Sequence, residues 1–213
     1  MSKVQVKICG ITSAADALAS VDAGANMLGF NFYPQSPRQI SEAAATKIRV
    51  QLPKRVKVVG IFVNRLPADV VTLRQSLALD FVQLHGDEPP ETVAELTRRA
   101  PVIKAFRLET DFALPILAEY PGVFAYLFDG ANRGQYGGTG RTTDWDVARR
   151  AAQSHRVILA GGLRVENVAA AVRIVRPYGI DVASGVETEP GRKDPGLVRE
   201  FIQEVRRAER KSV

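Results

Sequence analysis

The chain has 213 residues, of which 46% are apolar and 24% charged, a balance typical of a soluble globular protein with a continuous core. Its apolar runs, such as Val58–Val63, are too short to cross a bilayer, and Met1–Cys9 alternates polar and apolar residues, unlike a signal peptide. A single cysteine excludes an intrachain disulfide. We therefore expect a cytoplasmic protein with no membrane partner.

The net charge of +6 arises from 29 Lys and Arg against 23 Asp and Glu. The basic residues occur in scattered pairs, such as Arg98–Arg99 and Arg149–Arg150, and not as one cluster with interleaved aromatic residues. This pattern argues against a nucleic-acid partner and is typical of exposed helix faces. A diffuse basic field also attracts anionic small molecules.

Short runs rich in Val, Ile, Leu and Phe alternate along the chain with longer amphipathic segments. The runs predict strands at Val4–Ile8, Met27–Phe32, Val56–Val63, Phe81–Leu84, Val102–Phe106, Phe124–Phe128, Val157–Leu159 and Gly179–Val182. The segments between them predict helices at Ala14–Ala23, Glu42–Leu52, Ala68–Leu77, Pro89–Arg99, Phe112–Tyr120, Asp144–Gln153, Val165–Val175 and Pro195–Arg207. Ser13 and Ser41 stand where N-caps are expected, and Pro67, Pro89 and Pro195 stand near first turns.

The alternation of strands and helices indicates a parallel sheet with right-handed crossovers, and the continuous apolar strands indicate that both faces of the sheet are covered. Eight such units predict a single (β/α)8 TIM barrel that spans residues 1–213 as one domain. An open doubly wound sheet is the competing architecture. It would need a Gly-rich turn after the first strand, which Cys9-Gly10-Ile11-Thr12 does not supply.

In a parallel barrel the active site lies at the carboxyl ends of the strands, so the polar residues at these ends are the candidates. In chain order they are Cys9, Asn31 with the loop to Arg38, Asn64, His85, Arg107, Asp129, Gly161–Gly162, and Asp181 with Ser184–Gly185.

Two glycine-containing turns follow the last two predicted strands, Gly161–Gly162 and Ser184–Gly185. Without a Cβ atom, the backbone N–H groups of such turns can approach phosphate oxygens, and barrels often bind phosphate at these two loops. Tight turns that need a positive φ are the alternative for either turn alone, but the pair favours a phosphate site.

The longest Gly-rich loop, Gly130–Arg141, is a poor match to a P-loop, because no glycine stands five residues before Gly140 and Arg141 replaces the lysine. Its glycines favour a lid that closes over a substrate, and a flexible connection is the alternative.

Several single residues have two possible roles. Cys9 is either a small buried hydrophobic residue or, at the end of a strand, a reactive thiolate with a lowered pKa. Asp129 is a turn former or a proton donor, and His85 is a base, a ligand-orienting donor or a structural histidine. Two histidines and one cysteine form no recognisable metal cluster, so we expect no metal.

Ten short motifs at and around these strand ends resemble those of a known family, phosphoribosylanthranilate isomerase of tryptophan biosynthesis. The motifs that carry the resemblance are Lys7-Ile8-Cys9-Gly10-Ile11-Thr12, Gly29-Phe30-Asn31-Phe32-Tyr33, Ser36-Pro37-Arg38, Val59-Gly60-Ile61-Phe62-Val63-Asn64, Gln83-Leu84-His85-Gly86-Asp87-Glu88, Phe128-Asp129, Gly137-Gly138-Thr139-Gly140, Ala160-Gly161-Gly162-Leu163, Gly179-Ile180-Asp181-Val182 and Ser184-Gly185-Val186-Glu187. Their order along nearly the whole chain makes the set specific.

The resemblance implies an Amadori rearrangement of N-(5-phosphoribosyl)anthranilate to 1-(2-carboxyphenylamino)-1-deoxyribulose 5-phosphate. It implies Cys9 as general base, Asp129 as general acid, and Arg38 as the residue that binds the anthranilate carboxylate. Asp181 matches a carboxylate near the anilino nitrogen, His85 belongs to the substrate site, and phosphate falls to the Gly161–Gly162 and Ser184–Gly185 backbones. Neither step needs redox chemistry or a metal, so no cofactor is implied, and the chain is expected to be a monomer or a homodimer.

Three positions depart from the family pattern: Asn26 replaces an Asp, Thr143 a Phe, and Ala183 the first Ser of a Ser-Ser-Gly run. They bear on helix packing, the end of the lid and one hydroxyl contact to phosphate. A related dual-substrate isomerase that also serves histidine biosynthesis has Asp where Cys9 stands, so Cys9 favours the single-substrate enzyme. An inactive barrel that binds phosphorylated molecules is the alternative from another class.

Overall fold

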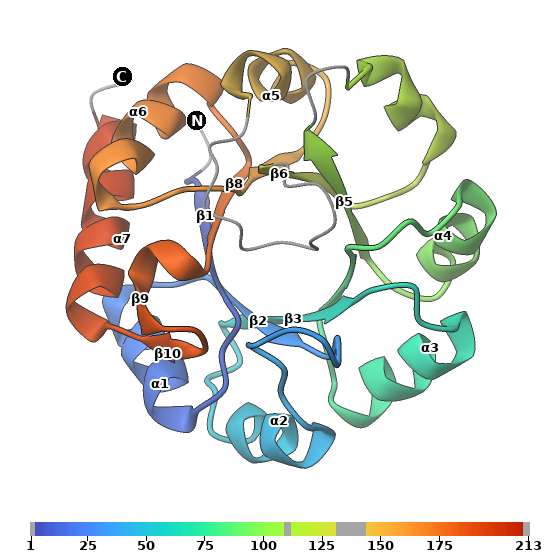
Figure 1. Cartoon of the computed structure of the whole chain (residues 1–213), viewed down its shortest axis with the longest axis horizontal. Helices are drawn as coiled ribbons and strands as arrows, with labels where there is room; N and C mark the ends of the chain where they lie inside the picture. The colour runs from blue at the N-terminus through green and yellow to red at the C-terminus, as the bar shows by residue number, and fades with distance from the viewer. Residues whose placement is uncertain (1–2, 109–111, 131–143, 211–213) are drawn as a thin grey trace.

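Eight parallel strands form a closed barrel in the computed structural model, which describes residues 3–108, 112–130 and 144–210 (Figure 1). The strands are β1 (Gln5–Cys9), β2 (Met27–Asn31), β3 (Lys57–Phe62), β4 (Phe81–Leu84), β5 (Val102–Leu108), β6 (Ala125–Gly130), β7 (Val157–Leu159) and β8 (Gly179–Val182). They follow the ring in chain order, and β8 pairs with β1 to close it. The predicted (β/α)8 barrel is confirmed.

A shell of helices surrounds the ring (Figure 1). Its members are α1 (Ala14–Ala23), α2 (Glu42–Arg49), α3 (Pro67–Ser76), α4 (Pro90–Thr97), the 3-10 helix η1 (Leu114–Glu119), α5 (Trp145–Ala152), α6 (Val165–Val175) and α7 (Pro195–Arg210). The predicted N-caps are confirmed, since the side chains of Ser13 and Ser41 accept hydrogen bonds from backbone N–H groups of the first turns of α1 and α2.

The helix predicted near Phe112–Tyr120 is present, but it is shorter than expected and is the 3-10 helix η1. Pro115 stands at its start, and Pro121 with Gly122, whose φ is +80°, follows directly, so the chain has room for only tight i to i+3 turns. The strands β5 and β6 are longer than expected and include Arg107 and Asp129 as paired residues.

A small hairpin between β8 and α7 was not predicted from the sequence. It consists of the one-turn 3-10 helix η2 (Ser184–Val186), β9 (Glu187–Glu189) and β10 (Arg192–Lys193), with β9 and β10 paired antiparallel. In Figure 1 the hairpin lies next to α1, at the joint between the last and the first unit of the barrel.

Two apolar cores hold the barrel. The larger lies between the strands and the helical shell and includes Ile8, Phe30 and Phe201. The smaller fills the inside of the barrel and includes Met27, Phe81 and Leu127. Residues of one strand alternate between the two cores, so the polar residues at the carboxyl ends continue the inward-facing rows.

Asn26, one of the three departures, lies at the opposite end of the barrel from the carboxyl ends of the strands. Its side-chain oxygen accepts hydrogen bonds from the N–H of Val6 at 2.9 Å and from Arg206 at 3.0 Å. Asn26 thereby connects β1 to α7. Its amide oxygen can accept the same two hydrogen bonds that the carboxylate of an Asp would accept.

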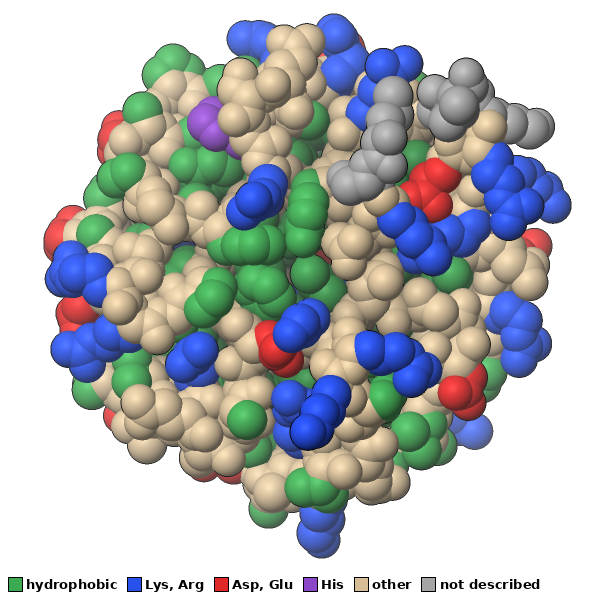
Figure 2. Space-filling view, turned by 180° about the vertical axis from the view of Figure 1, so that it is seen from behind, with side chains coloured by type: hydrophobic (Ala, Val, Ile, Leu, Met, Phe, Trp, Pro, Cys, Tyr) green, Lys and Arg blue, Asp and Glu red, His purple; other side chains and the backbone are tan. Residues whose placement is uncertain are grey.

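The barrel seen from behind shows apolar side chains over its centre and Lys and Arg side chains spread around them (Figure 2). The basic side chains are separated by other residues and do not form one strip. No helix of the described ranges is long and apolar enough to span a membrane.

The loop after β4 is held from inside the protein by a buried ion pair. The ammonium of Lys104 lies 2.8 Å from a carboxylate oxygen of Glu88 and donates to the carbonyl of Gly86 at 2.8 Å. The other oxygen of Glu88 accepts the N–H of Asn64 at 2.9 Å. This network places His85, which begins the loop, at the carboxyl end of the barrel.

Lys104→Met is expected to lower the free energy of unfolding by about 3–5 kcal/mol, because it leaves the Glu88 carboxylate buried without its cation. Urea titration followed by circular dichroism measures the loss. Lys57→Met is the matched control, since Lys57 pairs with Asp80 at the surface and its loss is expected to cost at most about 1 kcal/mol. Equal losses in both variants would show that the buried pair is not a structural brace.

Candidate active site

A cavity of about 330 Å³ opens at the carboxyl ends of the strands. Eight of the predicted site residues line it: Cys9, Arg38, His85, Asp129, Gly161, Gly162, Asp181 and Ser184. Gly185 is not among the lining residues and packs instead against the backbone of Leu163, so closely that a Cβ atom would collide with the Leu163 carbonyl. The barrel therefore brings together residues from the two ends of the chain, such as Cys9 and Ser184.

Cys9 ends β1 and is partly exposed at the wall of the cavity. Lys7, two residues earlier, points to the same side of the strand, and its ammonium lies 3.0 Å from a carboxylate oxygen of Asp181. Lys7 is only 1% exposed, yet its pKa is raised: burial opposes its charge, but Asp181 and Cys9 together outweigh burial. The base of the cavity thus holds a thiol, an ammonium and a carboxylate in contact.

The pKa of the Cys9 thiol is raised in the empty site. Burial is the largest cause and the charge of Asp181 adds to it, while Lys7 and Lys193 act in the opposite direction. The sequence interpretation of Cys9 as a reactive thiolate required a lowered pKa, and the environment of the thiol raises it instead.

Asp129 lies in β6, which is separated from β1 in the ring by β7 and β8. One of its oxygens accepts the N–H of Gly130 at 2.8 Å, and the other lies 3.4 Å from Nε2 of His85. The side-chain amide of Gln83 donates to Nδ1 of His85 at 2.9 Å, so a neutral His85 carries its proton on Nε2, facing Asp129. The histidine is therefore placed to orient the carboxyl group.

Two other strand-end candidates lie outside the cavity lining. Asn64 has a φ of +50° and accepts the N–H of Asp87 at 2.8 Å, so it braces the loop that carries His85. Arg107 forms an ion pair with Asp87 at 2.9 Å. Both residues belong to the frame around the site.

Arg38 is carried by a loop that Asn31, the last residue of β2, holds in place. The amide of Asn31 donates to Ser36 Oγ at 3.0 Å, and Ser36 Oγ in turn accepts the N–H of Arg38 at 3.1 Å. The guanidinium of Arg38 forms a two-pronged ion pair with Glu187, with Nη2 at 2.7 Å from the carboxylate. The strand-end asparagine thus positions the arginine and does not itself provide the charge.

The two glycine turns differ in backbone geometry, since Gly161 and Gly162 have the positive φ of a tight turn and Gly185 does not. Gly161 and Gly162 have φ values of +79° and +61°, and Ser184 begins the short helix η2. Among the described residues, no acceptor meets the backbone N–H groups of Gly162 and Ser184. Both residues line the cavity, so their N–H groups are candidates for binding an anion there.

The sequence interpretation gave no role to three charged residues near the cavity whose side chains are buried: Lys7, Glu187 and Lys193. Lys7 carried a signal, because a lysine inside an apolar strand two positions before Cys9 must share its face. Glu187 and Lys193 carried none that periodicity could detect, because they belong to the unpredicted hairpin.

The proposed lid, Gly130–Arg141, lies outside the described residues except for Gly130, and Thr143 lies outside them too. Within the described ranges, no group of three or more His, Cys, Asp or Glu residues could hold a metal ion.

A (β/α)8 barrel with a thiol, a carboxylic acid and an arginine around one cavity, and glycine turns after its last two strands, defines an enzyme of small anionic substrates. Comparison with known proteins gives the family. The profile of N-(5'phosphoribosyl)anthranilate (PRA) isomerase matches residues 6–204, and the chain belongs to this family.

The relatives agree over almost their whole length. An N-(5'-phosphoribosyl)anthranilate isomerase from Geotalea daltonii is 52% identical over 200 residues, 93% of this chain and 95% of its own. The crystal structure of the Thermotoga maritima phosphoribosyl anthranilate isomerase has a TM-score of 0.89 at 41% identity and covers 95% of this chain and 98% of that one. A phosphoribosyl anthranilate isomerase in complex with reduced 1-(o-carboxyphenylamino)-1-deoxyribulose 5-phosphate has a TM-score of 0.85 at 39% identity, with the same coverage.

The Cys9 thiol is expected to titrate above the ordinary range of cysteine, and Lys7→Met is expected to raise its pKa further, because it removes a charge that favours the thiolate. The pH dependence of iodoacetamide alkylation measures this without ambiguity, because Cys9 is the sole cysteine. Lys3→Met, which removes an exposed lysine just before the same strand, is the control and should leave the titration unchanged. Titration of the wild type near or below the ordinary value would contradict the environment described for Cys9.

Proposed function

We propose that this protein catalyses the Amadori rearrangement of N-(5-phosphoribosyl)anthranilate to 1-(2-carboxyphenylamino)-1-deoxyribulose 5-phosphate, a step of tryptophan biosynthesis. The observation that carries the proposal is that Cys9, Asp129 and Arg38 line one cavity with the two glycine turns, in a chain of the PRA isomerase family. The inactive barrel that only binds phosphorylated molecules receives no support from the comparisons, since the relatives are named as isomerases.

The anthranilate end and the phosphate end of the substrate are bound by different groups of the protein. Arg38 binds the anthranilate carboxylate, because a planar guanidinium can donate two parallel hydrogen bonds to it. Asp181 accepts from the anilino N–H. The phosphate is bound by the backbone N–H groups of Gly161–Gly162 and of Ser184, at the two loops where barrels of this kind commonly bind it, whereas Gly185 lies outside the cavity lining. His85 orients the acid.

Proton transfer starts at Asp129. Its carboxyl group protonates the furanose ring oxygen, the bond from that oxygen to C1 breaks, and the nitrogen lone pair completes an iminium ion. Cys9 then removes the C2 proton, which leaves an enolamine that tautomerises to the ketone. The proton lost at C2 balances the one gained at the ring oxygen, so no redox agent is consumed.

The raised pKa of the resting thiol is compatible with this sequence of steps. The iminium ion formed in the first step places a positive charge next to Cys9, and Lys7 and Lys193 already favour the thiolate. An adjacent cation lowers the pKa of an acidic group, so the thiol ionises once the sugar ring has opened. Protonation of the resting Cys9 also protects it from oxidation and alkylation.

Purified protein is expected to convert phosphoribosylanthranilate, followed as loss of anthranilate-type fluorescence, and Cys9→Ala or Asp129→Asn is expected to lower kcat by several orders of magnitude. A positioned general acid or base contributes about 10²–10⁴-fold. Thermal melts establish that each variant is folded. An unchanged rate in a folded variant would remove that residue from the mechanism, and no turnover in a folded wild type would restore the inactive barrel.

Arg38→Met is expected to raise KM more than it lowers kcat, because the arginine holds the carboxylate in the ground state and the transition state alike. Steady-state kinetics over a range of substrate concentrations separates the two parameters. A pure effect on kcat would contradict a binding role for Arg38.

The remaining expectations stay predictions: one domain over residues 1–213, a monomer or a homodimer, a cytoplasmic location, and no nucleic-acid partner.

A further inference from the structure

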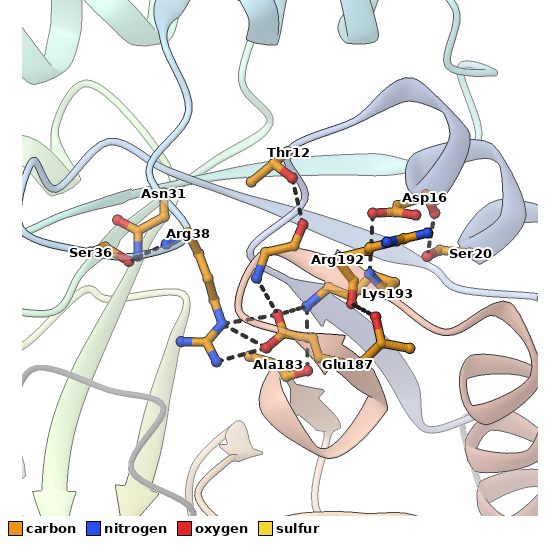
Figure 3. Close-up of polar contacts among 12 residues, drawn as sticks. Thr12, Asp16, Ser20, Asn31, Ser36, Arg38, Ala183, Glu187, Arg192 and Lys193 are labelled. Atoms are coloured by element: carbon orange, nitrogen blue, oxygen red, sulfur yellow. Dashed lines mark hydrogen bonds and ion pairs between the residues drawn. The ribbon is translucent and has the colours of Figure 1, made fainter.

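Three charged side chains, Arg38, Glu187 and Lys193, meet beside the cavity (Figure 3). The carboxylate of Glu187 accepts from Nε and Nη2 of Arg38 at 2.9 and 2.7 Å. The same carboxylate lies 2.7 Å from the ammonium of Lys193. The side chains of Glu187 and Lys193 are 4% and 1% exposed, so this cluster is buried within the protein.

We propose that Glu187, held by Lys193, is a positioning residue that fixes the guanidinium of Arg38 for a substrate carboxylate and so determines the preference for a carboxylated aromatic amine. The proposal rests on the proposed function, in which Arg38 binds that carboxylate. It assigns Glu187 and Lys193 no contact with substrate.

The geometry of the guanidinium leaves one edge for the ligand. Glu187 occupies the edge formed by Nε and Nη2, while no described residue accepts a hydrogen bond from Nη1. Arg38 lines the cavity. Because the guanidinium is planar and its first edge is fixed by a two-pronged ion pair, the edge formed by Nη1 and Nη2 is fixed too. A bidentate contact with a carboxylate needs such a fixed plane.

Lys193, the second cation of the cluster, explains how Arg38 can still attract an anion while it is paired with Glu187. Arg38 and Glu187 alone would form a neutral pair, whereas Lys193 brings the formal charge of the cluster to +1. Burial works against the ionised form of Glu187, but the hydrogen bonds from Arg38 and the charge of Lys193 outweigh it and lower its pKa. Glu187 therefore remains a carboxylate at neutral pH.

The hairpin of β9 and β10 holds this cluster against the loop that follows Cys9. The hydroxyl of Thr12 donates to the carbonyl of Gly191 at 2.5 Å, and the N–H of Lys193 donates to Asp16 at 3.2 Å (Figure 3). Gly191 donates in turn to Glu187 at 3.3 Å. The carboxylate is thus fixed relative to the β1–α1 turn and not left to a free side chain.

Gly10, directly after Cys9, provides the space for the stem of Arg38. Its φ is +74°, and a Cβ atom there would lie 2.6 Å from Cδ of Arg38. The arginine is therefore held between this turn and Glu187. A buried ion cluster is seldom the most stabilising choice for a core. Its place beside the cavity indicates a role in recognition.

The test compares two stable ligands, reduced 1-(o-carboxyphenylamino)-1-deoxyribulose 5-phosphate and its phenylamino counterpart without the carboxylate. Their Kd values are measured by calorimetry for the wild type, Glu187→Gln, Arg38→Met and the double variant. Glu187→Gln is expected to weaken the carboxylated ligand about 10–100-fold and to leave the other unchanged, because only the former uses the fixed guanidinium. In the Arg38→Met background, Glu187→Gln is expected to add no further loss.

Glu189→Gln is the matched control, since Glu189 lies on the same hairpin with its side chain 64% exposed. It should bind both ligands as the wild type does. Lys193→Gln is the second variant. It is expected to weaken the carboxylated ligand alone, because it leaves a neutral pair, and it replaces Glu187→Gln where the latter does not fold.

The outcomes separate the positioning role of Glu187 from the binding of the carboxylate by Arg38. Equal weakening of both ligands by Glu187→Gln, or a loss that persists in the Arg38→Met background, overturns the positioning role. Wild-type affinity for the carboxylated ligand in Glu187→Gln also overturns it, while the carboxylate binding by Arg38 stands. An Arg38→Met variant that weakens both ligands equally overturns the role of Arg38 itself.

Discussion

The pairing of the first strand with the last is the contact on which the site depends. Its register places Lys7 beside Asp181, and this ion pair lies below Cys9 inside the barrel. A slip of β1 by one residue would turn Lys7 out of the barrel and into the apolar shell, and would leave Asp181 inside without its counterion. The closure of the barrel and the chemistry of its cavity are therefore fixed by the same register.

Two buried clusters of charged residues, which differ in net charge, determine the electrostatics of the cavity. The cluster of Arg38, Glu187 and Lys193 carries a net positive charge, whereas Lys7 and Asp181 form a neutral pair. Cys9 lies near both, with Asp181 raising its pKa and the two lysines lowering it. In the proposed mechanism, the cationic intermediate adds to the two lysines a further charge that favours the thiolate.

The sequence predicted most of the frame because each strand and helix is specified locally. The apolar run Val157–Leu159 and the helix Val165–Val175 have the bounds expected from their patterns. The hairpin that carries Glu187 and Lys193 was not predictable in this way, because its position depends on Thr12 and Asp16, which lie about 175 residues earlier. Cys9 could be placed at the cavity from the end of its strand, but the direction of its pKa depends on partners that only the closed barrel brings together.

The hairpin contacts position 183, where Ala replaces a serine of the family pattern, through the backbone alone. Lys193 donates to the carbonyl of Ala183 at 3.3 Å, a contact that does not depend on the side chain at this position. The missing hydroxyl removes one donor next to the phosphate turn, whereas Ser184 retains its own at the cavity wall. In the proposed site, backbone N–H groups provide most of the phosphate binding, so the loss of one hydroxyl at position 183 leaves that set of donors intact. The proposed carboxylate end differs, since it depends on one guanidinium and on the residues that hold it.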